Sequence, residues 1–331
     1  MRYAPDMARW HGRSDTEEGL LGRRWHEVIQ PLNADTATGV AFVGFASDAG
    51  VARNHGRIGA RNGPATLRAM LSNMPVRHAA ISMTDAGDVI CEPDDNGDGL
   101  EAAQNELSTA LAELLQRQLL PIVLGGGHEM AFGSFGGLAR FLAQHEPDTV
   151  PRIGIVNLDA HFDLRQGDQA SSGTPFRQIA EDCQARGWPF NYCCLGVSAF
   201  SNTEALFDRA SKLGVRWRLD DEMDLTQREA SLDTLRDFLA GVDHVYFTIC
   251  LDVLPAAIAP GVSAPAARGV GLEVIEPLLD LVSASGKLRL ADIAELNPAH
   301  DIDNRTARVA ARLIARLVER SGAADDSSKT P

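Results

Sequence analysis

Three side chains of the kinds that bind metal ions stand at alternate positions near the middle of the chain: Asp159, His161 and Asp163. They directly follow the apolar run at residues 153–158. Alternate side chains of an extended strand project to one face, so this spacing aims two carboxylates and an imidazole at one point. Such charged groups are costly at the end of a buried strand unless they are paired or bind a metal. A strand that leaves the core into a polar loop with one solvated histidine would show the same local pattern.

Two other apolar runs end in residues of the same kinds. Residues 121–129 pass through three glycines to His128, and residues 245–252 end with Cys250 and Asp252, again two positions apart. In parallel α/β sheets, sites form where the carboxyl ends of strands meet the following loops. Three strands with potential ligands at their ends therefore predict one shared polar site that binds metal.

The six candidate ligands are more than one ion usually takes when positions are left for water. Two divalent ions bridged by carboxylates explain this number better. Carboxylate and imidazole ligands suit manganese better than they suit a closed structural zinc site. A two-metal site holds its ions about 3.5–4 Å apart and activates a shared water as hydroxide, which is hydrolytic chemistry. The sequence shows no nucleophilic-serine elbow, phosphate-binding loop or dinucleotide fingerprint.

The composition narrows the class of protein. The 331 residues are 44% hydrophobic and 23% charged, which is typical of a globular protein. The formal net charge of −14 argues against nucleic acid as a partner. We find no apolar run long enough to span a bilayer and no apolar signal region at the N-terminus, so we expect a cytoplasmic protein with no membrane partner. The five cysteines are scattered and show no disulfide framework.

Strand-like apolar runs alternate with helical patterns along the chain, including helical patterns at 64–71, 101–120 and 303–320. This alternation predicts a mainly parallel sheet covered on both faces. We expect one catalytic domain at 39–320, an N-terminal extension at 1–38 that wraps the core or meets a partner subunit, and a flexible tail at 321–331. The eight predicted strands lie at roughly 39–45, 80–90, 120–125, 153–159, 191–197, 214–219, 243–251 and 287–294.

These segments resemble the ureohydrolase superfamily of arginases and agmatinases, and most of all its formimidoylglutamase branch. The resemblance rests on Gly126-Gly127-His128-Glu129, on the block from Asp159 to Asp163, and on the third motif, which runs from Thr248 through Pro260-Gly261 to Gly269. It implies an arginase-like three-layer α/β/α sandwich, a centre of two Mn²⁺ per subunit, and hydrolysis of a guanidino or amidine C–N bond.

The resemblance also implies roles for single residues. His128 would bind one manganese ion and His161 the other, and Asp159, Asp163 and Asp252 would complete or bridge the pair. Asp163 would take a proton from the hydroxide that bridges the two ions and deliver it to the leaving amine. Glu295 would be the catalytic carboxylate that pairs with the cationic nitrogens of the substrate, although an acid that caps the start of a helix would also fit its sequence context.

Two positions depart from the family pattern. Cys250 stands where most ureohydrolases carry a bridging aspartate, so it is a ligand, a weak ligand or a buried bystander. Ser172 stands where arginases and agmatinases place a histidine in the substrate loop, which argues against arginine or agmatine as the substrate.

The substrate we expect is a small acidic molecule, because arginines cluster in the loops after the predicted strands. Asn54, Arg57 and Arg61 follow the first strand and resemble the corresponding formimidoylglutamase loop, and Arg177 follows the second motif. Arginine binds carboxylates through two parallel hydrogen bonds. For each arginine taken singly, a surface salt bridge is an equally good interpretation.

The resulting hypothesis is hydrolysis of N-formimidoyl-L-glutamate to L-glutamate and formamide, a step of histidine breakdown. The alternative within enzymes is a guanidino-acid hydrolase, for example one that acts on guanidinobutyrate and releases urea. The alternative outside enzymes is a related protein that binds a metal or ligand without catalysis. Cys250 is the residue that motivates this alternative. We also expect a homo-oligomer.

Overall fold

A computed structural model of the chain describes residues 1–77, 81–93, 95 and 97–327. The strands are β1 Arg2–Tyr3, β2 Gln30–Pro31, β3 Gly39–Ala46, β4 Met83–Ile90, β5 Leu119–Leu124, β6 Ile153–Leu158, β7 Asn191–Val197, β8 Arg216–Leu219, β9 His244–Cys250 and β10 Leu288–Ala294. The helices are α1 Ala49–Arg53, α2 Gly63–Leu71, α3 Leu100–Gln116, α4 Met130–His145, α5 Pro175–Arg186, α6 Glu204–Lys212, α7 Arg228–Ala240, α8 Leu272–Ala284 and α9 Arg305–Ser327.

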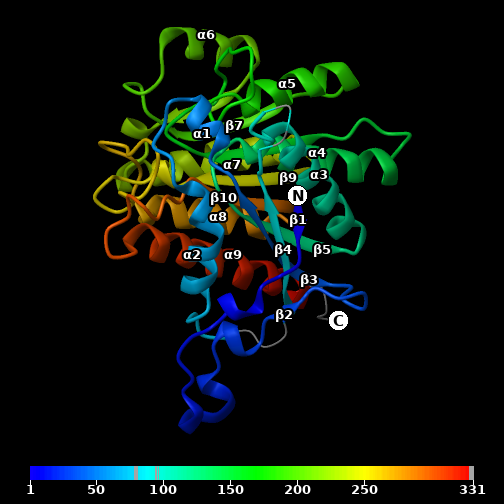
Figure 1. The fold of residues 1–331 in the computed structure, drawn as a ribbon. Helices are drawn as coiled ribbons and strands as arrows, with labels where there is room; N and C mark the ends of the chain where they lie inside the picture. The colour runs from blue at the N-terminus through cyan, green and yellow to red at the C-terminus, as the bar shows by residue number, and fades with distance from the viewer. Residues whose placement is uncertain (78–80, 94, 96, 328–331) are drawn as a thin grey trace.

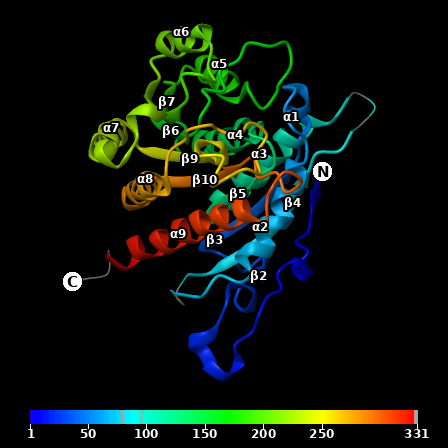
Figure 2. The same ribbon diagram turned by 90° about the vertical axis from the view of Figure 1, so that its left-hand side faces the viewer.

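The ten strands of the described residues belong to one sheet, in the order β1-β4-β3-β5-β10-β9-β6-β7-β8, with β2 paired to β4. Every pairing from β4 through β8 is parallel, and only β1 runs antiparallel to its neighbour. Helices lie on both faces of this sheet (Figures 1 and 2). The predicted three-layer sandwich with a mainly parallel sheet of about eight strands is therefore confirmed.

Two apolar cores separate the helices from the sheet. On one face, α2, α7, α8 and α9 contribute Leu71, Leu235, Leu278 and Ile314. On the other face, α3, α4, α5 and α6 contribute Leu107, Leu138, Ile179 and Leu206. Because both faces are covered, every residue of β6 and β9 is buried, and this is why these strands are continuous apolar runs in the sequence. Within the described ranges, none of the helices has the length and apolar character needed to cross a membrane.

The eight predicted strands correspond to β3 through β10, with boundaries that differ by a few residues. The strand predicted at 80–90 is β4, and residue 80 lies outside the described residues. The helix predicted at 303–320 is α9, which continues to Ser327 and so enters the segment predicted as a flexible tail. Residues 328–331 of that segment lie outside the described residues. The two-residue strands β1 and β2 were not predicted.

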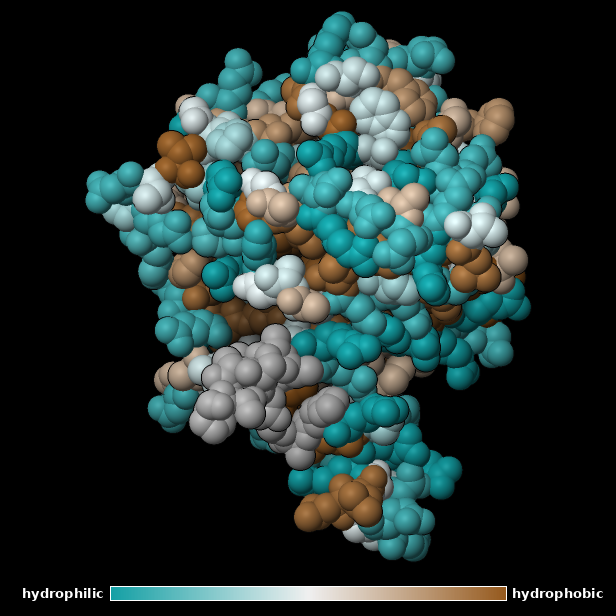
Figure 3. Space-filling view, turned by 180° about the vertical axis from the view of Figure 1, so that it is seen from behind, coloured by the Kyte–Doolittle hydropathy of each residue, from teal (hydrophilic) through white to brown (hydrophobic). Residues whose placement is uncertain are grey.

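Residues 1–38 pack along the β4 side of the sheet. Trp10 and Trp25 each place a ring 5.9 Å from the ring of Phe42 in β3. The indole N–H of Trp10 donates to Oδ2 of Asp85 at 2.6 Å, so the extension is fixed to the core by a buried polar contact as well as by packing. A lobe of this extension projects from the body of the molecule and carries apolar surface at its end (Figures 1 and 3). Leu20 and Leu21 are its most exposed large apolar residues.

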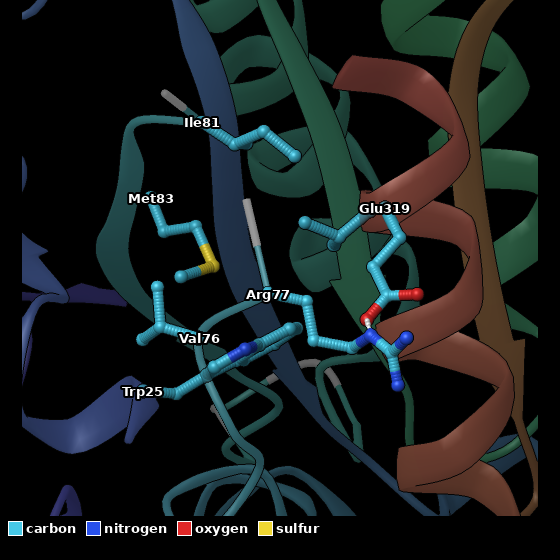
Figure 4. Close-up of a pocket in the computed structure, with 7 residues that line it drawn as sticks. Trp25, Val76, Arg77, Ile81, Met83 and Glu319 are labelled. Carbon is cyan, nitrogen blue, oxygen red and sulfur yellow. Dashed lines mark ion pairs between the residues drawn. The ribbon is translucent and has the colours of Figure 1, made fainter. Parts of the chain in front are cut away.

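A small cavity of about 10 Å³ lies between the extension and α9 (Figure 4). It has room for about one water molecule, which is too little for a substrate. It also lies at the amino end of β4, whereas the predicted ligands follow the carboxyl ends of strands. Its lining residues are Trp25, Val76, Arg77, Ile81, Met83, Val318 and Glu319.

Candidate metal centre and active site

Four neighbouring strands in the middle of the sheet, β5, β10, β9 and β6, position the candidate site. His128 follows β5 and Glu295 follows β10, while Cys250 is the last residue of β9 and Asp159 follows β6. Parallel strands bring their carboxyl ends to the same edge of a sheet, so segments distant in sequence meet there. The structure thus brings together the ligand segments that the sequence predicted to converge.

Asp159 lies between the two histidines. Its Oδ2 is 3.0 Å from Nδ1 of His128, and its Oδ1 is 3.5 Å from Nδ1 of His161. Asp163 approaches the same nitrogen of His128 at 3.0 Å, and Asp252 approaches Nδ1 of His161 at 3.1 Å. Asp159 therefore has the position of a carboxylate that bridges two cations, with one further carboxylate on each side.

The donor atoms form two overlapping groups that could each hold an ion. One group is His128, Asp159 and Cys250, and the other is Asp159, His161 and Asp252; within each group the atoms lie within 4.8 Å of one another. Asp159 is common to both groups. The structure places Cys250 among the donors of the His128 group, which favours the ligand interpretation over the buried bystander.

The residues present fit divalent cations. Nδ1 of His128 is buried and makes no aligned hydrogen bond to any described residue, although two carboxylate oxygens lie 3.0 Å from it. Burial, followed by the charge of Asp159, raises the pKa of Asp163 to about 6. Burial also raises the pKa of the Cys250 thiol, and the charges of Asp159 and Asp252 raise it further. Acids and ligand atoms crowded in this way, out of water, are stabilised by a shared cation.

Glu295 is a further acid beside these ligands. The turn after β5, which carries His128, holds it in place. Its Oε1 accepts the backbone N–H of His128 at 3.1 Å, and its Oε2 accepts the hydroxyl of Ser263. Its own N–H donates to the carbonyl of Gly126 at 3.0 Å. Burial, and then the charge of Asp252, raises the pKa of Glu295 to about 8.

The alternative role of Glu295 as a helix cap is wrong. The next α-helix of the described chain, α9, begins only at Arg305, and the carboxylate of Glu295 points instead to the turn that carries His128. The backbone of Glu295 is left-handed, with φ 68°, which is uncommon for a residue with a side chain. Such a conformation places its carboxylate beside the candidate ligands rather than along the strand.

The predicted substrate residues Asn54 and Ser172 meet beside this centre. The side-chain amide of Asn54 donates to Oγ of Ser172 at 3.2 Å. A Cβ atom on the next residue, Gly173, would lie 2.7 Å from Cδ of Arg165 and 3.1 Å from both amide atoms of Asn54. Glycine at position 173 therefore lets Arg165 approach the side chains of Asn54 and Ser172.

Two predicted arginines have other partners. Arg57 donates to the backbone carbonyls of Pro260 and Ser263, at 3.2 and 3.3 Å, so it holds the loop of the third motif. Arg177 donates to the carbonyl of Arg165 at 2.9 Å and forms an ion pair with Glu181 at 2.6 Å. Their guanidinium groups are thus engaged in holding loops, which favours a structural role for each over the alternative of a substrate ligand.

The two remaining arginines near the rim are exposed. Arg61, which the sequence predicted, and Arg165, which it did not, make no side-chain hydrogen bond or ion pair with any residue the structure describes. The signal that could have identified Arg165 is its spacing, because it continues the alternation of Asp159, His161 and Asp163. Two further polar residues, Thr248 in β9 and Asp292 in β10, are buried, and Oγ1 of Thr248 lies 3.0 Å from Nε2 of His128.

Comparison with known proteins gives a consistent result. The model of the arginase family matches residues 38–319. A formimidoylglutamase of Ralstonia nicotianae is 63% identical over 321 residues, covering 96% of this chain and 97% of that protein. A formimidoylglutamase of Aeromonas hydrophila is 54% identical, covering 95% of this chain and 98% of that protein.

Solved structures share the fold. The crystal structure of Trypanosoma cruzi formiminoglutamase with Mn²⁺ superposes with a TM-score of 0.72 and 23% identity, covering 96% of this chain and 98% of that one. The family match over most of the sequence and the identity to close relatives lead to one conclusion: the chain belongs to the arginase family.

Proposed function

We propose that this chain hydrolyses N-formimidoyl-L-glutamate to L-glutamate and formamide with two Mn²⁺ ions per subunit. The observation that carries the proposal is 63% identity, over 96% of the chain, to a protein named formimidoylglutamase. The donor set supports it, because the two groups around Asp159 offer ligands for two cations. Solved Trypanosoma cruzi formiminoglutamase contains Mn²⁺.

In the proposed centre, His128, Asp159, Asp163 and Cys250 hold one ion, and His161, Asp159 and Asp252 hold the other. Two such cations supply Lewis acidity and make a water molecule nucleophilic near neutral pH. Asp159 serves both positions because its two oxygens face different histidines. His128, Asp159, Cys250 and Asp252 are buried, which keeps bulk water from them and strengthens their interaction with charge, whereas His161 and Asp163 are partly exposed.

Asp163 is the proposed proton carrier. Its Oδ2 lies 3.0 Å from Nδ1 of His128, among the candidate ligands, where it could accept a proton from a water activated beside the cations and pass it on. In the reaction, the oxygen of water bonds to the formimino carbon, and the bond from this carbon to the glutamate nitrogen breaks. One proton of the water moves through Asp163 to that nitrogen, and the second reaches it when the carbonyl of formamide forms, so that the cationic amidine becomes neutral formamide and glutamate leaves with an ammonium group.

Glu295 is the proposed partner of the amidine. Its carboxylate lies at the carboxyl end of β10, which stands between β5 and β9 in the sheet order, next to the segments that carry His128 and Cys250. The amidinium of the substrate would stabilise its charged form, because an adjacent cation favours a carboxylate over the neutral acid. The hydroxyl of Ser263 and the N–H of His128 keep the carboxylate in place.

The two carboxylates of the substrate require donors at the rim. We assign them to Arg165, Asn54 and Ser172, with Arg61 as a further cation. The amide–hydroxyl pair and the exposed guanidinium of Arg165 lie around Gly173, directly after the second motif. Local positive charge of this kind is needed, because a chain with a formal net charge of −14 repels an anionic substrate at long range.

A substrate panel tests the proposal. Purified protein supplied with Mn²⁺ is given N-formimidoyl-L-glutamate, guanidinobutyrate, arginine and agmatine in parallel, and both glutamate and urea are measured. Glutamate from the first compound with little or no urea from the others supports the proposal. Urea from guanidinobutyrate, without glutamate from formimidoylglutamate, would support the guanidino-acid hydrolase instead. Fewer than two ions per chain and no hydrolysis of any compound would support the silent relative. Assembly into a homo-oligomer and a cytoplasmic location stay predictions.

A further inference from the structure

His128 has a second polar contact on the side away from the carboxylates. Its Nε2 lies 3.0 Å from Oγ1 of Thr248, which is completely buried in β9. The ring therefore lies between two different environments, with Nδ1 facing Asp159 and Asp163 and Nε2 facing a hydroxyl. Only a nitrogen without a proton can bind a metal, so the proton of a neutral His128 must be held on Nε2 for Nδ1 to act as the ligand.

A buried carboxylate lies behind this hydroxyl. Thr248 and Asp292 are paired residues in the register of β9 and β10. Asp292 is 1% exposed, and its Oδ2 accepts the hydroxyl of Tyr246 at 2.6 Å. Burial raises the pKa of Asp292, whereas the charge of His128 and the hydroxyls of Thr248, Tyr246 and Ser134 oppose this rise.

The remaining oxygen of Asp292 is open to one more donor. Among the described residues, no aligned donor reaches its Oδ1, and Oγ of Ser134 is likewise buried without an aligned partner. A hydroxyl hydrogen rotates freely to suit its neighbours. Thr248 carries one such hydrogen, which can point either to Nε2 of His128 or to Asp292.

The charge on Asp292 decides between these directions. Because the two residues are paired in register, an ionised Asp292, which only accepts hydrogen bonds, would draw the hydroxyl hydrogen of Thr248 toward itself, and the oxygen of Thr248 would then accept from Nε2–H of His128. Hydrogen bonds to a charged acceptor are roughly twice as strong as those between neutral groups. An ionised Asp292 would thereby set the direction of donation from His128 through Thr248.

We propose that Thr248 and Asp292 are positioning residues that hold the proton of His128 on Nε2 and so leave Nδ1 free as a metal ligand. Tyr246 supports the carboxylate through its other oxygen. The inference rests on the metal centre of the proposed function, but it concerns metal binding and can be measured without any substrate. Failure of the substrate assignment would leave it untouched.

The first test compares two substitutions of Thr248 in the full-length protein. Thr248→Val keeps the shape and removes the hydroxyl, whereas Thr248→Ser keeps the hydroxyl. Loss of a group that orients a metal-bound histidine typically weakens metal binding about 10- to 100-fold. We expect such a loss for Mn²⁺ in the valine variant, confined to one of two ions, and affinity within about threefold of the original chain in the serine variant. Titration of the metal-free proteins against a competing chelator measures both.

The second test concerns the anionic end of the chain and does not depend on the folding of the valine variant. Asp292→Asn has the same shape, but its amide can donate to Thr248 and turn the hydroxyl toward Nε2, which favours a proton on Nδ1. We expect binding of the His128-held ion at least about tenfold weaker. Tyr246→Phe removes one donor and keeps the carboxylate, so its effect should be less than about threefold.

Several results would overturn the proposal. Equal affinities of the valine and serine variants would show that the hydroxyl is unimportant. An asparagine variant that binds both ions as tightly as the original chain would show that the charge of Asp292 has no role. A larger loss in Tyr246→Phe than in Asp292→Asn would indicate that core packing, and not the carboxylate, controls the site. Thermal melting of each metal-free variant separates loss of folding from loss of binding.

Discussion

The backbone N–H of His128 donates to Oε1 of Glu295 at 3.1 Å, although the two residues are 167 positions apart in the sequence. The contact joins the turn after β5 to the turn after β10, and these two strands are neighbours in the sheet. It places an acid with a pKa of about 8 against the backbone of a candidate metal ligand. The stability of the metal-free protein should therefore respond to pH through Glu295.

The direction of that response follows from proton binding. The ordinary pKa of Glu is 4.5 and its value in the folded chain is about 8, so between these pH values the folded state binds more protons than the unfolded state. The free energy of unfolding should fall as the pH rises through this window, by up to about 1.4 kcal/mol per pH unit. Urea unfolding in the presence of a chelator measures it.

Glu295→Gln removes this titration and is the matched variant. The raised pKa values of Asp163, His128 and His161 contribute in the same direction, so the slope of the variant should be smaller but not zero. Identical slopes for the two proteins would show that Glu295 does not titrate as the structure indicates. The difference between the two curves, rather than either curve alone, carries the result.

Replacement of Cys250 tests whether the thiol is a ligand. Metal binding deprotonates a coordinating thiol, and a thiolate bound to Co²⁺ gives a charge-transfer absorption in the near ultraviolet. We expect this absorption in the Co²⁺-loaded chain and its loss in Cys250→Ser. Mn²⁺ affinity at this position should fall at least about tenfold in the serine variant, because even the loss of a supporting contact has that effect.

Cys250→Asp supplies the control for that experiment. It introduces the carboxylate that the family resemblance led us to expect at this position, and an oxygen ligand suits manganese better than sulfur does. Mn²⁺ binding in this variant should equal or exceed that of the original chain, again without the thiolate absorption. If Cys250→Ser kept both the absorption and the metal affinity, the thiol would be a bystander.

Arg165 should control substrate binding and not turnover. Loss of a hydrogen bond to a charged group costs about 1.5–3 kcal/mol, so Arg165→Ala should raise KM by about 10- to 100-fold while kcat changes little. Arg165→Lys should recover only part of this loss, because lysine offers a point charge and not a planar fork. Steady-state kinetics with N-formimidoyl-L-glutamate measure both constants.

Arg186→Ala is the matched control for Arg165. Arg186 forms an ion pair with Asp182 on the same helix, α5, at 2.6 Å and has no contact with the candidate site. Its removal should leave KM unchanged. An effect of Arg186→Ala as large as that of Arg165→Ala would mean that the rim responds to general charge and not to a specific contact.

Arg68 should be essential for stability. It is 1% exposed and pairs with Asp85 and Asp88, at 2.7 Å in each case. Removing one member of a buried charge network leaves the other charges unpaired and typically costs about 3–5 kcal/mol, so Arg68→Ala should unfold at much lower urea concentration. Arg152→Ala, which breaks an exposed pair with Asp243, should cost less than about 1 kcal/mol. Equal losses of stability in Arg68→Ala and Arg152→Ala would contradict the conclusion that a buried pair contributes more than an exposed one.

The sequence predicted the parts of the molecule that local patterns encode. Strands buried on both faces, such as β6 and β9, are mainly apolar runs, and the predicted ranges match β3 through β10 with small errors at their ends, although β8 is short and only partly buried. The ligand residues stand directly after such runs, and parallel pairing alone is enough to bring them together. The two-residue strands β1 and β2 carry too little pattern to be recognised.

Other features depend on contacts that no local pattern contains. Arg57 was predicted as a substrate ligand because of its loop, but its guanidinium donates to carbonyls about two hundred residues away in the chain. The pairing of Thr248 with Asp292 depends on the register between β9 and β10, which the sequence does not specify by itself. The polar character of these two residues inside apolar strands was the available signal.

The most direct test of the central claim is the initial rate of glutamate release from N-formimidoyl-L-glutamate by one preparation in three states: as purified with Mn²⁺, after removal of metal by a chelator, and after Mn²⁺ is restored. The account predicts turnover in the first state, loss in the second, and recovery in the third, with formamide formed in equal amount to glutamate. Unchanged glutamate release after complete removal of metal, or no release in any state, would contradict it.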